Sequence, residues 1–106
     1  SFVLIEGAGG LYSPIAEAAL NVDLAIALQL PLLIVVLDEL GAISQALLTL
    51  EAARKNKLTV ACVVLNVVRR NNLSNKAALK AYTKTPVISF SQDGLEAFYS
   101  EIERLV

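Results

Sequence analysis

Four short apolar runs, separated by segments with helical spacing, limit the fold of this chain more than any other feature. Each run is continuous rather than alternating in polarity, which is typical of strands covered on both faces in a parallel sheet. The pattern therefore predicts an α/β fold with a central parallel sheet and the order βαβαβαβα. The runs are FVLIE (2–6), LLIVVLD (32–38), VACVVLNV (60–67) and PVISF (86–90).

Helix signals fill the segments between these runs. Asn21 or Asp23 can cap the first helix, and Pro31 stops it. Arg54 and Lys55 fall near the end of the second helix, where cations suit the helix dipole. The expected helices cover LAIALQL (24–30), the segment that follows Gly41, KAALKAYTK (76–84) after Ser74, and QDGLEAFYSEIERLV (92–106).

Length and composition allow one compact domain over residues 1–106. The chain is 56% hydrophobic and carries nine basic against ten acidic residues. A net charge of −1 gives no electrostatic footprint for nucleic acid or for an anionic membrane. No apolar run reaches the roughly 18 residues of a membrane span, and the first residues lack the charged and apolar regions expected of a secretory signal. The one cysteine, Cys62, lies inside an apolar run and is expected to be a buried hydrophobe, which suits the cytoplasm.

Two absences lead us to expect that the chain is a fragment. It contains no methionine and opens directly on strand-like residues, so we expect an upstream part. It also lacks the phosphate-binding pattern G-x-x-x-x-G-K-[ST]. If a nucleotide site exists, its phosphate-binding half is expected upstream. We further expect the 106 residues alone to be inactive and marginally stable or prone to aggregation, because the first strand would lack its partner.

In open parallel sheets, ligands gather outside the carboxyl ends of the strands. This rule points to Glu6–Gly10, Asp38–Gly41, Asn66–Asn72 and Phe90–Asp93. Glu6 is a carboxylate at the tip of an apolar strand, where a metal ion, a cation or hydrogen bonds must compensate its charge. Small residues after it would let backbone amides approach a ligand. The residues alone also allow a salt-bridged acid followed by an ordinary turn.

Two further strand ends offer ligand contacts. The free amides at the helix start after Gly41, with Ser44 and Gln45, can bind an anion, although an ordinary strand-to-helix turn would use the same residues. The amide of Asn66 can match the edge of an adenine, but asparagine is also a common turn residue. The chain has no histidine, which excludes a Ser-His-Asp triad and histidine ligands within it.

Taken together, two stretches resemble the second half of dethiobiotin synthetase, the ATP-dependent enzyme of biotin biosynthesis. They are VLIEGAGGLYSPI (3–15) and LPLLIVVLDELGAISQALLTLEAARKNKLTVACVVLN (30–66). The similarity covers about residues 2 to 68 strongly and weakens afterwards. It implies a three-layer α/β/α fold like that of P-loop NTPases. It also implies a missing N-terminal half that carries the phosphate-binding loop.

The resemblance assigns roles to single residues. It implies that Glu6 helps to bind Mg²⁺, that Gly9 and Gly10 line the substrate 7,8-diaminononanoate, and that Asn66 recognises the adenine of ATP. It also implies a homodimer in which a helix start holds the substrate carboxylate and reaches into the neighbouring subunit. The residues of that half-site are Leu40, Gly41, Ala42, Ile43 and Ser44.

The implied reaction traps carbon dioxide on one amine, phosphorylates the carbamate with ATP and closes a cyclic urea with the second amine. Two departures from the family pattern stand out. Ser44-Gln45 replaces the usual Asn-His, so the carboxylate contact is expected to differ. Residues 89–93 lack the usual proline-containing loop, which predicts a weaker adenine site. Alternatives are a related P-loop amidating ligase or ATPase, or a non-catalytic domain of the same fold.

Overall fold

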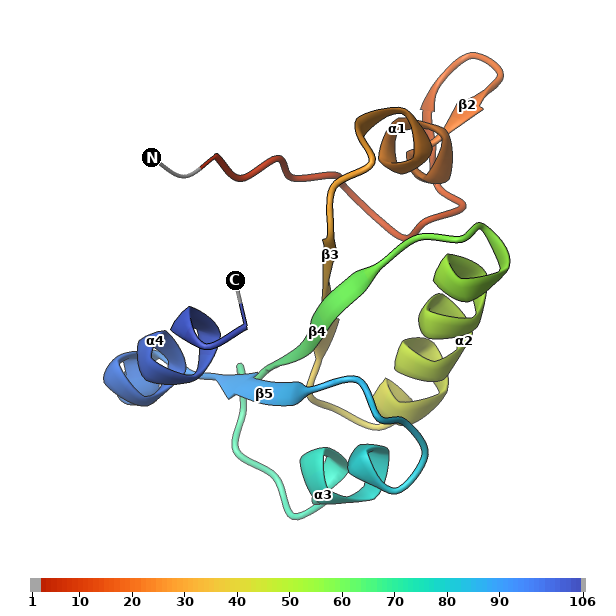
Figure 1. Cartoon of the computed structure of the whole chain (residues 1–106). Helices are drawn as coiled ribbons and strands as arrows, with labels where there is room; N and C mark the ends of the chain where they lie inside the picture. Colours follow the sequence, from red (N-terminus) through yellow and green to blue (C-terminus); the bar gives the residue numbers. More distant parts are fainter. Residues whose placement is uncertain (1–2, 106) are drawn as a thin grey trace.

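The computed structural model describes residues 3–105 (Figure 1). Its elements alternate between strands and helices, as the apolar runs predict, and a small hairpin precedes them. In chain order they are β1 (Pro14–Ala16), β2 (Ala19–Leu20), α1 (Asn21–Leu28), β3 (Leu32–Leu37), α2 (Ala42–Lys55), β4 (Val60–Asn66), α3 (Asn75–Lys80), β5 (Val87–Phe90), the 3₁₀ turn η1 (Gln92–Gly94) and α4 (Leu95–Glu103).

The three longer strands form a parallel sheet in the order β3-β4-β5. Leu37, Asn66 and Phe90 are register partners at the ends of these strands. The carboxyl ends of all three strands therefore meet at one edge of the sheet. This edge, toward the lower left of Figure 1, is where the α/β rule expects ligands.

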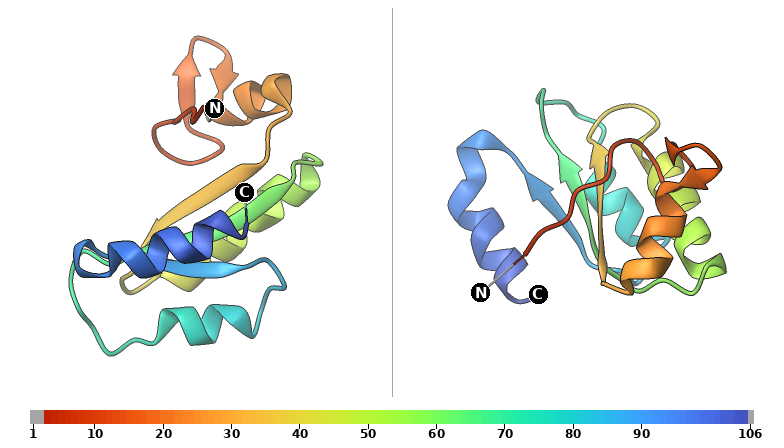
Figure 2. Two further views of the ribbon diagram at one scale, coloured as in Figure 1. Left: turned by 60° about the vertical axis from the view of Figure 1, so that its left-hand side comes forward. Right: turned by 90° about the horizontal axis from the view of Figure 1, so that it is seen from above.

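Helices cover both faces of the sheet, which confirms the three-layer α/β/α prediction (Figure 2). On one face α2 and α3 bury Val63, Leu65 and Leu79 completely. On the other, α4 covers the side of the sheet that carries Cys62, and Phe98 packs edge-on against Phe90 with ring centroids 4.9 Å apart. Burial raises the pKa of the Cys62 thiol, which agrees with the predicted role of this residue as a buried hydrophobe.

Helix α1 begins and ends close to the predicted signals. The Asp23 carboxylate accepts a hydrogen bond of 2.8 Å from the Leu20 N–H just before the helix. Asn21, the other predicted cap, is the first residue of the helix and its side chain binds elsewhere. The helix ends at Leu28, and Gln29 follows in the left-handed conformation with φ 52°. Pro31 lies just beyond this end, as expected.

The predicted first strand is wrong for the residues that can be checked. Residues 3–6 form no strand, and Val3 and Ile5 are 79% and 50% exposed; Phe2 lies outside the described residues. An extended segment becomes a strand only when a neighbour pairs with its backbone. The described sheet contains β3, β4 and β5 alone, so the apolar composition of 3–6 has no ladder to join.

Three further differences are local. The hairpin β1–β2 was not predicted, because its strands of three and two residues are too short for a pattern. Helix α3 ends at Lys80 rather than continuing to residue 84. Ser74 precedes α3 as expected, but its φ of 54° is left-handed and its side chain makes no capping hydrogen bond. Within residues 3–105, every helix is too short or too polar to cross a membrane.

Candidate functional site

The carboxyl edge of the sheet brings two predicted ligand regions together. The Asp38 N–H, directly after β3, donates a hydrogen bond of 2.9 Å to the carbonyl of Asn66 at the end of β4. Val67 in turn donates to the Phe90 carbonyl over 2.7 Å. The half-buried Asn66 therefore lies beside the turn that leads to the predicted half-site.

The predicted half-site divides between solvent and core. Leu40 is 85% exposed and Ser44 is exposed, whereas Ala42 is buried and Ile43 packs against the core. Leu40 and Ser44 are therefore the two of these five residues that have exposed side chains. The backbone adds more, because the N–H groups of the first helical turn have no acceptor within the helix.

Gly41 sets the direction of this helix start. Its φ of 95° is disfavoured for residues with a side chain, and a Cβ at this position would meet nothing within 4 Å. The requirement for glycine is therefore conformational rather than steric. The Ala42 N–H donates to the Glu39 carbonyl over 3.1 Å. This leaves the amides of Ile43 and Ser44 at the start of α2.

Two asparagines that the sequence analysis did not single out hold this turn in place. Asn71 donates from Nδ2 to the Asp38 carbonyl over 2.9 Å. Asn75 donates from Nδ2 to Asp38 Oδ1 over 2.8 Å and to the Glu39 carbonyl over 3.0 Å. The signal in the sequence was slight: a polar loop after a strand, with three asparagines whose amides can donate two hydrogen bonds each.

The segment Gly7–Gly10, here called the glycine turn, is compact. The Gly10 N–H donates to Ser13 Oγ over 3.0 Å, and the Ser13 N–H donates back to the Gly10 carbonyl over 3.0 Å. Gly9 has φ 81°, and a Cβ there would lie 2.5 Å from Ser13 Oγ. Glycine is required at this position for both conformation and space. Glu6, just before the turn, is exposed.

A buried asparagine of α1 holds the glycine turn through two hydrogen bonds. Asn21 is 8% exposed and donates from Nδ2 to the carbonyls of Ala8, over 2.6 Å, and Gly10, over 2.9 Å. Because both neighbours are acceptors, the amide can face them only with its nitrogen. Its Oδ1 is therefore turned toward Gly7, where a Cβ would lie 3.0 Å away, and this oxygen has no hydrogen-bond partner among the described residues.

The structure does not bring the glycine turn to the carboxyl edge. The turn lies beside α1, near the end of the molecule where β3 and β4 begin (Figures 1 and 2). Its neighbour Tyr12 accepts a hydrogen bond of 3.3 Å from Asn56, which follows the last turn of α2. The prediction that all four segments share one edge is therefore met at Asp38–Gly41, Asn66 and Phe90, and wrong for Glu6–Gly10 in this chain. Nothing places Glu6 at the edge, because residues 3–6 pair with no strand of the sheet.

Comparisons with known proteins agree with the resemblance. A family model described as AAA domain matches residues 1–90. The ATP-dependent dethiobiotin synthetase of Vesicomyosocius okutanii is 45% identical over 99% of this chain, and that of Ruthia magnifica is 42% identical over 99%. The chain belongs to the dethiobiotin synthetase family.

The matches cover nearly all of this chain but only about half of each relative. The chain covers 49% of the length of each of these two synthetases. A third synthetase, from Bacillus thuringiensis, is 38% identical over 81% of this chain and 37% of its own length. The chain therefore spans about half the length of these two curated dethiobiotin synthetases. Membership also confirms the predicted P-loop NTPase-like fold class.

The metal that this family resemblance implies can be tested against the donors present. Residues 3–105 contain no group of three or more His, Cys, Asp or Glu side chains that could hold a metal ion. Mg²⁺, however, commonly takes only one or two carboxylates and completes its shell with phosphates and water. Glu6, an exposed carboxylate beside a turn of small residues, fits such a single ligand.

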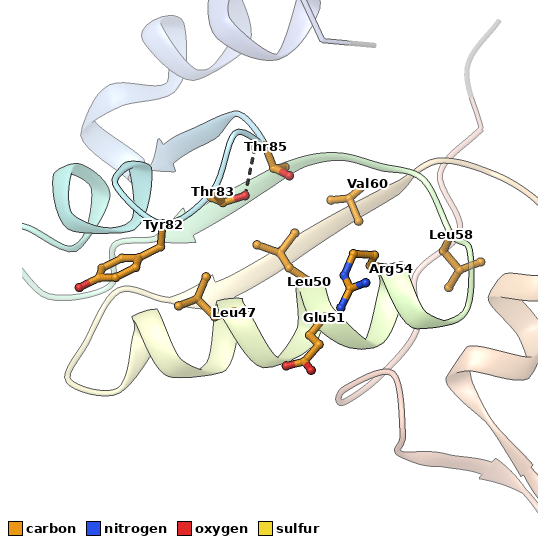
Figure 3. Close-up of a pocket in the computed structure, with 9 residues that line it drawn as sticks. All are labelled: Leu47, Leu50, Glu51, Arg54, Leu58, Val60, Tyr82, Thr83 and Thr85. Atoms are coloured by element: carbon orange, nitrogen blue, oxygen red, sulfur yellow. Dashed lines mark hydrogen bonds between the residues drawn. The ribbon is translucent and has the colours of Figure 1, made fainter.

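A hollow on the surface of the described residues lies elsewhere. It is a groove of about 660 Å³ between α2 and the connection from α3 to β5, where the Thr85 N–H donates to Thr83 Oγ1 over 3.1 Å (Figure 3). No residue of the predicted site lines it, so it gives no support for a dethiobiotin synthetase ligand site. The lining residues are Leu47, Leu50, Glu51, Arg54, Leu58, Val60, Tyr82, Thr83 and Thr85.

Proposed function

We propose that this chain is the C-terminal half of an ATP-dependent dethiobiotin synthetase. The enzyme would form the cyclic urea of dethiobiotin from 7,8-diaminononanoate, carbon dioxide and ATP with Mg²⁺. The observation that carries the proposal is the carboxyl edge, where the Asp38–Asn66 hydrogen bond sets a helix start with free amides beside an asparagine at a strand end. The two relatives named as dethiobiotin synthetases support it over nearly the whole chain.

The carboxyl edge would supply two binding functions. The amides of Ile43 and Ser44 and the Ser44 hydroxyl would hold the substrate carboxylate, because a helix start favours an anion. The exposed Leu40 and Gly41 would face the neighbouring subunit of a homodimer. Asn66 would donate to and accept from the edge of the adenine. We place the enzyme in the cytoplasm, because the free thiol of the buried Cys62 suits a reducing compartment.

The glycine turn would supply the metal and diamine contacts. Glu6 would be one ligand of Mg²⁺, and the backbone of Gly9 and Gly10 would line the diamine, which the absence of side chains allows. When bound, Mg²⁺ neutralises charge on the phosphoryl group that is transferred. Glu6 lies apart from the carboxyl edge in this chain, so we propose that the glycine turn is brought to that edge when the preceding segment pairs with a strand of the remaining half.

The reaction divides between the two halves. One amine of the substrate attacks carbon dioxide and loses a proton, which gives a carbamate. A carbamate oxygen then attacks the γ-phosphorus of ATP and ADP leaves. The second amine attacks the carbonyl carbon and loses a proton, and phosphate leaves as the urea ring closes. Since the chain has no G-x-x-x-x-G-K-[ST] pattern, the phosphate contacts would come from the other half, and the 106 residues alone would be inactive.

The test is urea formation by the complete protein with ATP, Mg²⁺, bicarbonate and 7,8-diaminononanoate, measured beside Glu6→Gln. Loss of a charged metal ligand is expected to lower kcat by about 100-fold or more and to raise the Mg²⁺ concentration needed for half-maximal rate. Glu17→Gln is the matched control, because Glu17 is an exposed acid in the nearby hairpin without a proposed role.

Three outcomes separate the alternatives. If the complete parent protein forms no urea, the synthetase proposal is wrong. If it hydrolyses ATP or amidates another substrate instead, a related P-loop ligase or ATPase is favoured. If it binds no nucleotide, the non-catalytic alternative is favoured. Turnover of Glu6→Gln equal to that of Glu17→Gln would remove Glu6 from the metal site while leaving the synthetase assignment in place.

A further inference from the structure

Asp38 is the point at which three segments of the carboxyl edge meet. Its N–H donates to Asn66 at the end of β4 over 2.9 Å. Its carbonyl accepts from Asn71 in the loop after β4 over 2.9 Å. Its carboxylate accepts from Asn75 at the start of α3 over 2.8 Å. The backbone and side chain of one residue therefore tie β3 to β4, to the following loop and to α3.

Asn75 provides the most protected of these contacts. It is only 7% exposed, and its Nδ2 donates two hydrogen bonds to the turn. One goes to the Asp38 carboxylate and the other to the Glu39 carbonyl, 3.0 Å away. A hydrogen bond to a carboxylate is among the stronger ones in proteins, and burial protects it from competing water. Asn75 is itself carried by α3, which Leu79 anchors in the core with no exposed surface.

The residues held by Asn75 come directly before the proposed half-site. Only Leu40 separates Glu39 from Gly41, and Gly41 stands in a left-handed conformation that sets the entry into α2. The space beside Gly41 is open, since a Cβ there would meet nothing within 4 Å. Buried Ala42 holds the helix start against the core, and the bonds to residues 38 and 39 set the direction from which the chain enters it.

We propose that Asn75 and Asp38 are positioning residues for the substrate-carboxylate half-site. Neither touches the substrate: Asn75 holds the Asp38–Glu39 turn, and the turn aims the free amides of Ile43 and Ser44. A helix start displaced by a fraction of an ångström keeps its fold but loses alignment with the carboxylate. This inference rests on the proposed function, because it concerns the same substrate.

The test uses the complete protein with Asn75→Ala. The KM for 7,8-diaminononanoate should rise about tenfold, as expected when a bond that aligns a charged contact is lost, while kcat and the KM for ATP change by less than about twofold. Asn72→Ala is the matched control: Asn72 is an exposed asparagine of the same loop, and its side chain makes no hydrogen bond within residues 3–105.

A second substrate separates positioning from a general structural role. In 2,3-diaminononane a methyl group replaces the carboxylate, so the helix start has nothing to hold. Asn75→Ala and the parent protein should then have KM values within about twofold of each other. An equal penalty with both substrates, or a fall in kcat with an unchanged KM for 7,8-diaminononanoate, would overturn the positioning role.

Two more variants keep the test decisive if Asn75→Ala folds poorly. Asn71→Ala removes the exposed bond to the Asp38 carbonyl, together with local bonds to Arg69 and Leu73 in the same loop, and should raise the same KM about twofold to threefold. The double variant Asp38→Asn with Asn75→Asp reverses donor and acceptor and should recover part of the affinity lost in Asn75→Asp alone. Absence of both effects would sink the inference. A parent protein without urea formation would instead sink the proposed function, so the two failures are distinguishable.

Discussion

The glycine turn and the Asp38–Gly41 turn are held by the same device in different settings. In each, one buried asparagine donates two hydrogen bonds from Nδ2: Asn21 to the carbonyls of Ala8 and Gly10, and Asn75 to Asp38 and Glu39. Both turns also contain a glycine at positive φ. The local chemistry of the two turns is therefore nearly equivalent.

Their connection to the sheet is not equivalent. The Asp38–Gly41 turn is bonded to β4 through Asn66 and to the core through α3. The glycine turn is bonded to α1 and to Ser13 of the hairpin segment, and the segment before it pairs with no strand among the described residues. Local hydrogen bonds shape a turn, whereas a strand ladder places it. The carboxyl edge is thus preorganised within this chain. The conformation of the glycine turn is fixed by local hydrogen bonds, but no strand pairing fixes its position relative to the sheet.

The unpaired Oδ1 of Asn21 extends the contrast. Buried polar atoms without partners are uncommon, and each one weakens the fold by about 1–3 kcal/mol. At the carboxyl edge, the described residues show no such side-chain atom. The glycine turn, in contrast, packs its Gly7 against an acceptor that has no partner among residues 3–105. This agrees with the proposal that the turn changes place when residues 3–6 join a sheet.

The largest expected effect tests whether α3 anchors the carboxyl edge. Leu79→Ala removes a side chain with no exposed surface and should lower the free energy of unfolding of the complete protein by about 3 kcal/mol. Hydrogen exchange should accelerate at residues 38–44 and stay unchanged at residues 7–10.

Leu48→Ala is the control for that measurement, because Leu48 lies on α2 and is 64% exposed, so its loss should change stability by less than about 0.5 kcal/mol. Equal acceleration of hydrogen exchange at both turns in Leu79→Ala would contradict the claim that only one of them is tied to the core.

Substitution of the two glycines with positive φ, Gly9 and Gly41, should lower stability by an intermediate amount and allows a matched comparison of the two turns. Gly41→Ala meets only the left-handed backbone penalty of about 1 kcal/mol, since the space around it is open. Gly9→Ala meets the same penalty and places a Cβ 2.5 Å from Ser13 Oγ, so its total should reach about 2–3 kcal/mol.

Chemical denaturation of both variants in the complete protein measures the difference. Adding Ser13→Ala to Gly9→Ala should recover part of the loss, because it removes the clashing oxygen. If Gly9→Ala and Gly41→Ala prove equally stable, the glycine turn is looser in the complete protein than in this chain.

Much of the fold followed from the sequence because its signals are local. The runs at 32–38, 60–67 and 86–90 became β3, β4 and β5, and the spacing after Gly41 became α2. The same logic was wrong at residues 3–6, whose composition is equally apolar. Strand formation there depends on a neighbour that composition cannot supply. A pattern indicates what a segment can become, and pairing decides what it does become.

The candidate site was also predictable only in part. The rule for parallel sheets located Asp38–Gly41 and Asn66 correctly at one edge, because it depends only on strand direction. It could not find Asn75, whose importance arises from burial against Asp38, a residue 37 positions earlier in the sequence. Nor could it find Asn21, because that contact requires α1 to fold against the glycine turn. Long-range hydrogen bonds between single side chains leave no periodic trace.

The smallest effect is expected from removing an exposed ion pair, which tests whether charge or the asparagine hydrogen bonds hold the carboxyl edge. Arg70 and Asp93 form an ion pair of 3.5 Å that joins the loop before α3 to η1, but their side chains are 91% and 84% exposed. Exposed pairs contribute about 0–1 kcal/mol and are screened by salt, so Arg70→Ala should leave the unfolding midpoint almost unchanged at 0.15 M salt. The KM for 7,8-diaminononanoate should also stay within about twofold of the parent value, in contrast to Asn75→Ala. A tenfold rise in this KM would show that the exposed ion pair, rather than the buried amide of Asn75, positions the turn.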